Sequence, residues 1–172
     1  MNLKRNLIVS LIVLSAVFGF SGNASAGGLY FGINLEMLAG NQGNTSGSVT
    51  FGVFPLPLPG IEAGYDFGDA LEGFGARLSI NFLIIRTVSL DVYYRFTLDA
   101  SGSNAYLGAG YDLEDFSFDI SLVYNGLHAL AGYEWRFAPS FAVFIEAAPG
   151  FLIWSGGTFV AATLRTGLIW HL

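Results

Sequence analysis

The 172-residue sequence has no cysteine, and its only lysine is Lys4. The missing cysteine excludes a disulfide framework, a cysteine-ligated zinc site and a lipoprotein anchor. Beyond the first 26 residues, no run of 18 apolar residues occurs, so no transmembrane helix is predicted there. An exported domain of this kind has to be held together by packing and hydrogen bonds alone.

Residues 1–26 have the pattern of a secretory signal peptide. The basic pair Lys4-Arg5 precedes an apolar run, Leu7–Phe20, and Ala24–Ala26 provides an A-x-A cleavage site. The apolar run is shorter than the ~20 residues that a membrane-spanning helix needs, although an uncleaved N-terminal anchor is the alternative. Cleavage at this site is expected to leave one mature domain, residues 27–172, which contains no lysine.

The mature domain is acidic and rich in apolar residues. It keeps five arginines and all 13 acidic residues, for a net charge of 5 − 13 = −8, which argues against a nucleic-acid partner. The whole chain is 53% hydrophobic and 16% aromatic, but small or polar residues interrupt the apolar ones at every second position. Only helices and closed barrels satisfy every backbone polar group in a bilayer. Without a spanning helix, a membrane protein with this sequence has to be a β-barrel.

The period-two alternation predicts an all-β fold, a closed antiparallel up-and-down barrel of ten strands. The predicted strands are residues 29–37, 49–53, 61–67, 74–82, 88–96, 105–113, 116–124, 127–137, 141–147 and 160–172. We expect a turn at Pro55–Gly60, because proline cannot donate a ladder hydrogen bond. Asn125-Gly126 is a two-residue hairpin signal, and a turn there pairs apolar with apolar positions. If the Pro-rich hairpin at 49–67 sits outside the wall, eight strands remain.

An even number of strands places the N-terminus and the C-terminus of the barrel on one side of the membrane. With a periplasmic N-terminus, the segments expected to face outward are Asn41–Ser48, Asp69–Gly73, Asp99–Gly102, Asn125-Gly126 and Pro149–Gly157. Those expected to face the periplasm are the Pro-rich turn, Leu83–Thr87, Glu114-Asp115 and Ala138–Ser140.

The alternation alone does not say which face is outside, and a soluble sandwich or lipocalin-like barrel is the alternative. Three features favour lipid: the mature domain lacks the lysines of a typical soluble surface, its polar face is rich in small residues, and aromatic residues gather near strand ends. These aromatic residues are Tyr65, Phe67, Phe74, Phe82, Tyr94, Phe96, Phe116, Tyr124, Trp135, Phe137, Phe141 and Trp170.

The signal peptide, the glycine-rich aromatic first strand Gly28–Gly32, the short turns and the alternating last strand resemble small outer-membrane barrels of the OmpX and OmpA transmembrane-domain type. The resemblance implies a bacterial outer-membrane location, membrane lipids as partners, and recognition of the C-terminal strand by the outer-membrane assembly machinery. Such barrels tend to end in Phe or Trp, whereas this chain ends in Leu172 with Trp170 two residues earlier. A monomer is expected, and nothing resembles the peptidoglycan-binding domain of full-length OmpA-type proteins.

On this interpretation the inward face carries most of the charge. Its predicted carboxylates are Glu36, Glu62, Asp66, Asp91, Asp112, Asp119, Glu134 and Glu146, and its arginines are Arg77, Arg95, Arg136 and Arg165. Buried charges have to be paired or hydrated, and the guanidinium fork suits the bridging of carboxylates. We therefore predict a structural Arg–carboxylate network that plugs the lumen, formed by Arg77, Arg95, Arg136, Arg165, Asp91, Asp119, Glu134 and Glu146. The alternative is a small cation-attracting pore.

The sequence offers little for enzymatic chemistry. His128 is predicted to face inward with Ser121 diagonal to it, whereas a lipid hydrolase needs its Ser and His on the lipid-facing surface, with a carboxylate that orients the His. A resemblance to lipid A deacylases would require a Ser two residues after the His, and here that position is Leu130. His171 is the penultimate residue. No metal-ligand spacing, cofactor motif or nucleotide motif occurs, so a non-enzymatic barrel is expected, either a structural or surface-interaction protein or a passive channel.

Overall fold

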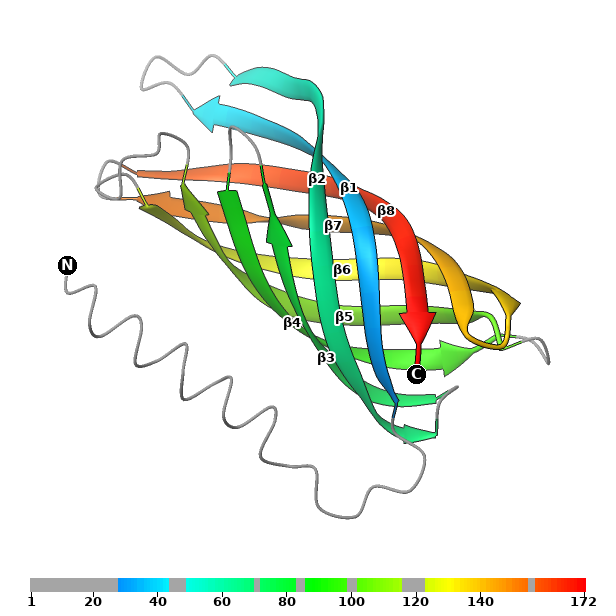
Figure 1. The fold of residues 1–172 in the computed structure, drawn as a ribbon. Coiled ribbons are helices and arrows are strands. Elements are labelled where there is room, and N and C mark those ends of the chain that lie inside the picture. The colour runs from blue at the N-terminus through cyan, green and yellow to red at the C-terminus, as the bar shows by residue number, and fades with distance from the viewer. Residues whose placement is uncertain are drawn as a thin grey trace.

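The computed structural model describes residues 28–43, 49–69, 72–82, 86–98, 102–115, 123–154 and 157–172. They form a closed antiparallel barrel in which each strand pairs with the next and β8 pairs with β1 (Figure 1). The strands are β1 (Leu29–Gly43), β2 (Val49–Asp69), β3 (Glu72–Asn81), β4 (Arg86–Thr97), β5 (Asn104–Asp115), β6 (Val123–Ala138), β7 (Phe141–Trp154) and β8 (Gly157–His171). The predicted signal peptide lies outside the described residues.

The barrel has eight strands, so the prediction of ten is wrong and the alternative of eight is correct. The predicted Pro-rich turn is part of β2, which runs without a break through its prolines. The ladder with β1 is irregular here: Glu36 pairs with Leu58, but Leu38 pairs with Phe54. The part of β2 that precedes Gly60, moreover, has no partner in β3, because Gly60 pairs with the last residue of that strand. The prolines therefore lie at an irregularity of the β1 ladder and past the end of β3, where their missing N–H groups cost no ladder bond among the described residues.

The predicted hairpin at Asn125-Gly126 is also wrong, because both residues lie inside β6. Gly126 pairs with Asp112 of β5 on one side and with Leu152 of β7 on the other. Ladder bonds to two neighbouring strands outweigh a local turn preference. Glycine serves a packing role here, since a Cβ would lie 2.8 Å from the Leu152 side chain. Residues 116–122 of the predicted seventh strand lie outside the described part of the chain.

Because these two predicted turns are absent, several connections between strands lie at the end of the barrel opposite to the one predicted. Gly28 and Leu172 lie at the same end, called the terminal end here, and the opposite end is called the distal end. The described ends of the β2–β3 and β4–β5 connections lie at the terminal end, and those of the β3–β4 and β5–β6 connections lie at the distal end. This is contrary to the sides predicted for Asp69–Gly73, Asp99–Gly102, Leu83–Thr87 and Glu114-Asp115, whereas Ala138–Ser140 lies at the terminal end as predicted. Because the predicted turn in β2 is absent, each later connection falls at the opposite end of the barrel from the one predicted. The absence of the predicted turn in β6 reverses this, so that the connections after β6 fall at the predicted end.

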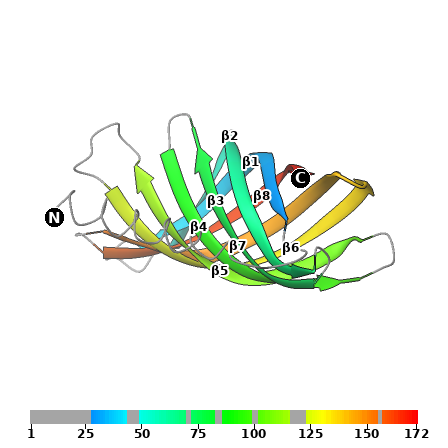
Figure 2. The same ribbon diagram turned by 60° about the horizontal axis from the view of Figure 1, so that its bottom comes forward.

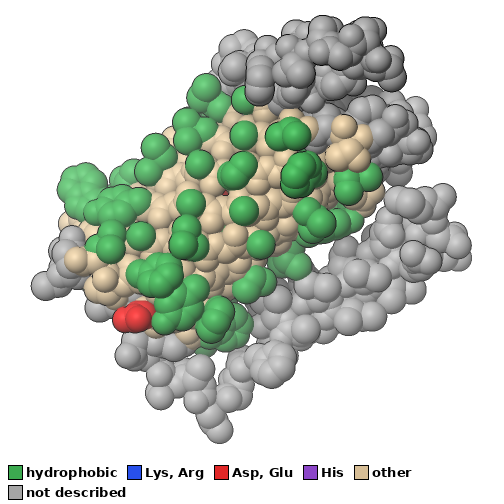
Figure 3. All heavy atoms as spheres, turned by 180° about the vertical axis from the view of Figure 1, so that it is seen from behind, with side chains coloured by type: hydrophobic (Ala, Val, Ile, Leu, Met, Phe, Trp, Pro, Cys, Tyr) green, Lys and Arg blue, Asp and Glu red, His purple; other side chains and the backbone are tan. Residues whose placement is uncertain are grey.

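The two faces of the wall have opposite characters. Large apolar side chains point outward and are exposed, for example Ile33 at 58%, Leu107 at 56% and Ile145 at 52%. On the face shown in Figure 3, hydrophobic side chains are spread over the described wall, and acidic ones appear only at its lower edge. Charged side chains such as Asp91 and Glu134 are instead fully buried inside. This inverted pattern identifies lipid as the surroundings of the outer wall. Within the described residues, no helix is long and apolar enough to cross a membrane.

Outward aromatic side chains cluster near the terminal end. Phe141 stacks between Phe137 and Trp170, with ring centroids 6.4 and 6.3 Å away. On the other side of the barrel, Tyr94 makes edge contacts with Phe74 and Phe96 at about 5 Å. Such rings suit the interface between hydrocarbon and headgroups, so this end of the wall carries an aromatic girdle.

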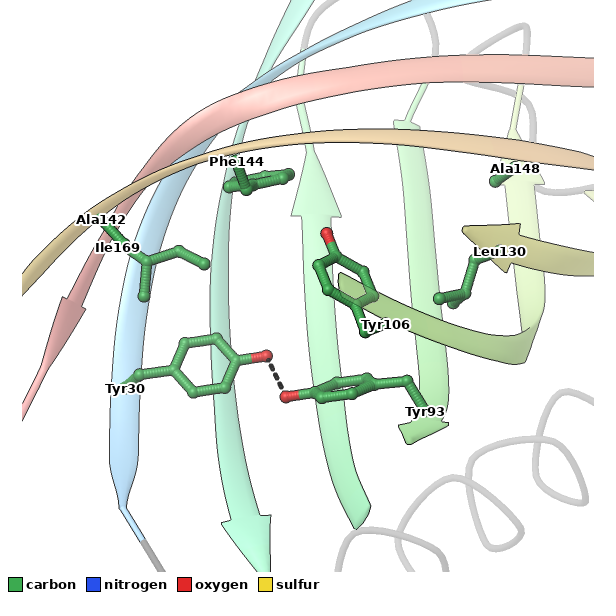
Figure 4. Packing of buried hydrophobic residues seen from close by; sticks show 8 residues of the cluster. All are labelled: Tyr30, Tyr93, Tyr106, Leu130, Ala142, Phe144, Ala148 and Ile169. Atoms are coloured by element: carbon green, nitrogen blue, oxygen red, sulfur yellow. Dashed lines mark hydrogen bonds between the residues drawn. The ribbon is translucent and has the colours of Figure 1, made fainter. Parts of the chain in front are cut away.

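Inward apolar and aromatic residues form a small core in the lumen (Figure 4). The cluster consists of Tyr30, Tyr93, Tyr106, Leu130, Ala142, Phe144, Ala148 and Ile169. Each of the three tyrosine rings lies over a glycine on a neighbouring strand, namely Gly64, Gly75 and Gly132, respectively. A Cβ at any of these glycines would collide with the ring, so glycine provides the space that a narrow lumen needs. The steep strands that enclose this space are seen from a second direction in Figure 2.

Candidate functional site: the charged lumen

The structure brings the predicted network residues together in two clusters inside the barrel. The central cluster contains Arg77 of β3, Asp91 of β4, Glu146 of β7 and Arg165 of β8. The terminal cluster contains Arg95 of β4 with Glu134 and Arg136 of β6. Asp119, the remaining predicted member, lies outside the described residues.

Arg77 is the best-connected cation of the central cluster. Its Nε and Nη2 donate hydrogen bonds of 2.9 and 2.6 Å to Asp91 Oδ2, and Nη2 also donates to Glu146 Oε2 at 2.7 Å. Arg165 Nη1 lies 3.4 Å from Asp91 Oδ2 and 3.3 Å from Glu146 Oε1. Each arginine therefore contacts both carboxylates.

These contacts cross the lumen. In an eight-stranded barrel, strands four positions apart lie opposite each other, as β3 and β7 do, and β4 and β8. The Arg77–Glu146 and Arg165–Asp91 contacts therefore bridge the barrel along two different diameters. All four side chains are at most 2% exposed. The charged groups are therefore removed from solvent, and these contacts have to offset the cost of their desolvation.

His128 extends the central cluster toward β5. Its Nε2 lies 3.0 Å from Asp91 Oδ1 and its Nδ1 lies 2.6 Å from Asp112 Oδ2. Asp112 Oδ1 in turn accepts a 2.5 Å hydrogen bond from Ser89 Oγ. Ionised carboxylates only accept, so an imidazole between two of them has to donate from both nitrogens and carry a positive charge.

The terminal cluster is organised around two carboxylates. Asp66 Oδ2 accepts a 2.6 Å hydrogen bond from Arg95 Nη1, and Asp66 Oδ1 accepts one of 2.8 Å from the Tyr93 hydroxyl. Arg95 Nη2 also lies 3.2 Å from Glu134 Oε2. Glu134 Oε1 lies 3.3 Å from Arg136 Nη2 and 2.9 Å from His171 Nε2. The cluster therefore joins β2, β4, β6 and β8.

A tyrosine pair lies beside the terminal cluster. The hydroxyls of Tyr30 and Tyr93 are 2.9 Å apart, and the Tyr93 ring tilts against Tyr106 with centroids 5.5 Å apart (Figure 4). Because Tyr30 belongs to β1 and Tyr93 to β4, this bond also crosses the lumen.

Sequence reasoning placed Glu36, Glu62, Asp66 and Asp112 on the inward face but did not assign them to the network. It missed the polar neutral residues that bond to them, in particular Asn34 with Glu62 and Asn81 with Glu36. The same period-two pattern carries these asparagines inward. Their partners depend on the stagger between strands, which the pattern does not specify.

The described lumen holds more acid than arginine. Its seven carboxylates are Glu36, Glu62, Asp66, Asp91, Asp112, Glu134 and Glu146, against Arg77, Arg95, Arg136 and Arg165. A charged His128 offsets one further negative charge. Glu36 lies 3.3 Å from Arg165 Nε and Asp112 lies 2.6 Å from His128, whereas the cation recorded nearest to Glu62, Arg77, is 4.0 Å away.

The chemistry of this site is charge pairing. Ser89 bonds to Asp112 and makes no hydrogen bond to His128, so the described residues place no hydroxyl against the imidazole as a nucleophile would require. Ser121 lies outside the described residues. Across the described parts of the chain, no three His, Asp or Glu side chains are grouped to hold a metal ion.

No protein-family model matches the chain, and no curated protein matches its sequence. Among solved structures, the chain is similar to Neisserial surface protein A (NspA), with a TM-score of 0.51 and 17% identity over 81% of this chain and 96% of that one. Ail, the attachment invasion locus protein of Yersinia pestis, was solved with the heparin analogue sucrose octasulfate. It gives a TM-score of 0.44 and 15% identity over 85% and 97% of the two chains. A designed transmembrane β-barrel gives a TM-score of 0.43 and 12% identity over 82% of this chain and 95% of the designed one.

At these identities the likeness shows the fold alone. The chain has the fold of the small outer-membrane β-barrels, and its resemblance to OmpX-type barrels is confirmed at that level.

Proposed function

We propose that this chain is a non-enzymatic outer-membrane β-barrel with a structural or surface-interaction role, whose lumen is closed by the Arg–carboxylate network. A closed barrel with an apolar wall is the form in which bacterial outer-membrane proteins cross the bilayer. One observation carries the closure of the lumen: the central bridges run along two diameters, through Arg77–Glu146 and Arg165–Asp91.

Several features support a closed lumen. The bridging side chains are almost fully buried, and the tyrosine pair forms another crossing nearer the terminal end. A water-filled channel would leave such side chains in contact with solvent. The barrel on this proposal is a rigid stem that presents the connections at its distal end.

The second candidate is a small passive pore that prefers cations. The excess of carboxylates over arginines in the described lumen favours it, because a negative lining attracts cations. The two candidates differ in one measurable property, the conductance of the resting barrel.

Recordings in planar bilayers test the proposal. The purified full-length barrel is expected to give no stable conductance steps and no swelling of solute-loaded liposomes. The double variant Arg77→Ala/Arg165→Ala removes both central bridges and is expected to produce cation-selective steps. Arg136→Ala, at the partly exposed edge of the terminal cluster, is the control and should stay silent. Stable cation-selective steps in the unaltered protein would establish the pore instead.

The remaining parts of the proposal concern enzymes and partners. Overexpression is expected to leave the acylation of lipid A unchanged, and a change in acyl content would identify a lipid-modifying enzyme. We expect membrane lipids to cover the outer wall and the assembly machinery to recognise the C-terminal strand β8. The barrel is expected to be a monomer.

A further inference from the structure

Two buried asparagines face each other across a glycine in the wall of the lumen. Asn34 of β1 pairs with Gly60 of β2, and Gly60 pairs with Asn81 of β3, so the three residues form one row across adjacent strands. Both asparagines point inward and are nearly fully buried, at 3% and 1% exposed. Because Gly60 has no side chain, the Oδ1 atoms of both amides lie directly over it, and a Cβ there would overlap both.

The orientation of these amides follows from their partners. Asn34 Nδ2 donates a 3.1 Å hydrogen bond to Glu62 Oε2, and Asn81 Nδ2 donates to Glu36 Oε2. A flipped amide would turn its oxygen toward a carboxylate, so the nitrogen has to be on that side. Both carbonyl oxygens are therefore left facing the space above Gly60, and neither has a hydrogen-bond partner.

The adjoining row adds two more oxygens. Glu62 pairs with Ser79 of β3, one row closer to the terminal end. Glu62 Oε1 and Ser79 Oγ are buried and lack hydrogen-bond partners. The Arg77 guanidinium, which is the nearest cation to Glu62, lies 4.0 Å away and directs its hydrogen bonds to Asp91 and Glu146. Four acceptor atoms without donors thus lie in two adjoining rows of three neighbouring strands.

We propose that the Asn34–Gly60–Asn81 row, together with Glu62 and Ser79, binds a calcium ion. All four side chains offer oxygen, which is the ligand of hard cations, and calcium accepts carbonyl, carboxylate and water oxygens in irregular geometry. The ion would satisfy the buried acceptors and offset carboxylate charge that the arginines leave unpaired. Magnesium fits less well, because it demands near-octahedral geometry and gives up water reluctantly. This site goes beyond the proposed closure of the lumen and does not depend on it.

Calorimetric titration of the folded full-length barrel in detergent, after treatment with a chelator, tests the proposal. Calcium is expected to bind at one ion per barrel, more tightly than magnesium, and to raise the thermal midpoint of unfolding. Asn34→Ala and Asn81→Ala each remove one ligand and are expected to weaken calcium binding at least tenfold. Asn104→Ala is the matched control, since Asn104 is equally buried and also has a free carbonyl oxygen, but belongs to β5 at the terminal end.

A further variant, Gly60→Ala, places a methyl group where the two carbonyl oxygens lie and displaces them, while it keeps every ligand residue and every charge. It is expected to abolish calcium binding. Heat-modifiable gel mobility measures the folded fraction of each variant. If one substitution prevents folding, the calcium affinities of the remaining folded variants test the proposal. The proposal is overturned if the unaltered barrel takes up no calcium, or if its affinity falls less than tenfold in the folded Asn34→Ala and Gly60→Ala proteins.

Discussion

Replacement of Arg77 by methionine probes the central cluster most sharply. The guanidinium makes three hydrogen bonds to two fully buried carboxylates, and a third carboxylate lies 4.0 Å away. Each hydrogen bond to a charged group contributes about 1.5–3 kcal/mol, but the desolvation of Arg77 itself offsets part of the sum. Loss of one partner of a buried pair costs about 3–5 kcal/mol, because the other charge stays buried and uncompensated. We expect Arg77→Met to lower the free energy of unfolding by that amount.

Urea unfolding of the barrel in lipid vesicles, followed by tryptophan fluorescence and by gel mobility without heating, measures the effect. The matched control is Arg136→Met, whose side chain is 11% exposed and makes one ion pair at 3.3 Å; its cost should stay below about 2 kcal/mol. The double variant Arg77→Met/Glu146→Gln removes a stranded carboxylate and should recover at least about 1 kcal/mol of the loss. The reasoning is refuted if Arg77→Met costs no more than Arg136→Met.

Three further predictions concern the lumen and the outer wall. Tyr93→Phe removes the hydroxyl that donates to Asp66 at 2.8 Å and should lower the free energy of unfolding by about 1.5–3 kcal/mol in the same urea assay; an unchanged midpoint would show that this bond contributes nothing. Gly75→Val inserts a side chain where the Tyr93 ring lies and should cost about 1–3 kcal/mol, visible as a lower yield of folded barrel; wild-type yield would contradict the packing. Leu164→Arg, in the middle of β8, should cost about 2–4 kcal/mol of unfolding free energy, whereas Trp170→Arg near the strand end should cost about 0–1 kcal/mol; equal costs would mean that depth in the bilayer does not matter here.

The sequence predicted the face of each charged residue better than it predicted the strands. The lumen of a membrane barrel is its polar face, so the period-two pattern assigns Arg77 and Asp91 inward without knowledge of their partners. Their contacts depend on the number of strands and on the stagger between them. Only with eight strands does β3 lie opposite β7, so that Arg77 can reach Glu146 across the lumen.

The errors arose where a local turn signal met a continuous ladder. The prolines of residues 55–59 were compatible with a strand because this part of β2 lies past the end of β3, and Asn125-Gly126 stayed extended between two neighbouring strands. The apolar-to-apolar match across the predicted 125–126 hairpin did not detect the error. The glycine-rich inward face was recognised, but the pairing of each glycine with a tyrosine was not, since it depends on the register between strands.

The central claim is that this chain is a lipid-embedded closed barrel, and cell fractionation combined with gel mobility tests it most directly. We predict that the protein is recovered in the outer-membrane fraction and that its unheated form in SDS migrates at a different position from the boiled form. Recovery in the soluble periplasmic fraction, with a single mobility before and after boiling, would contradict the account.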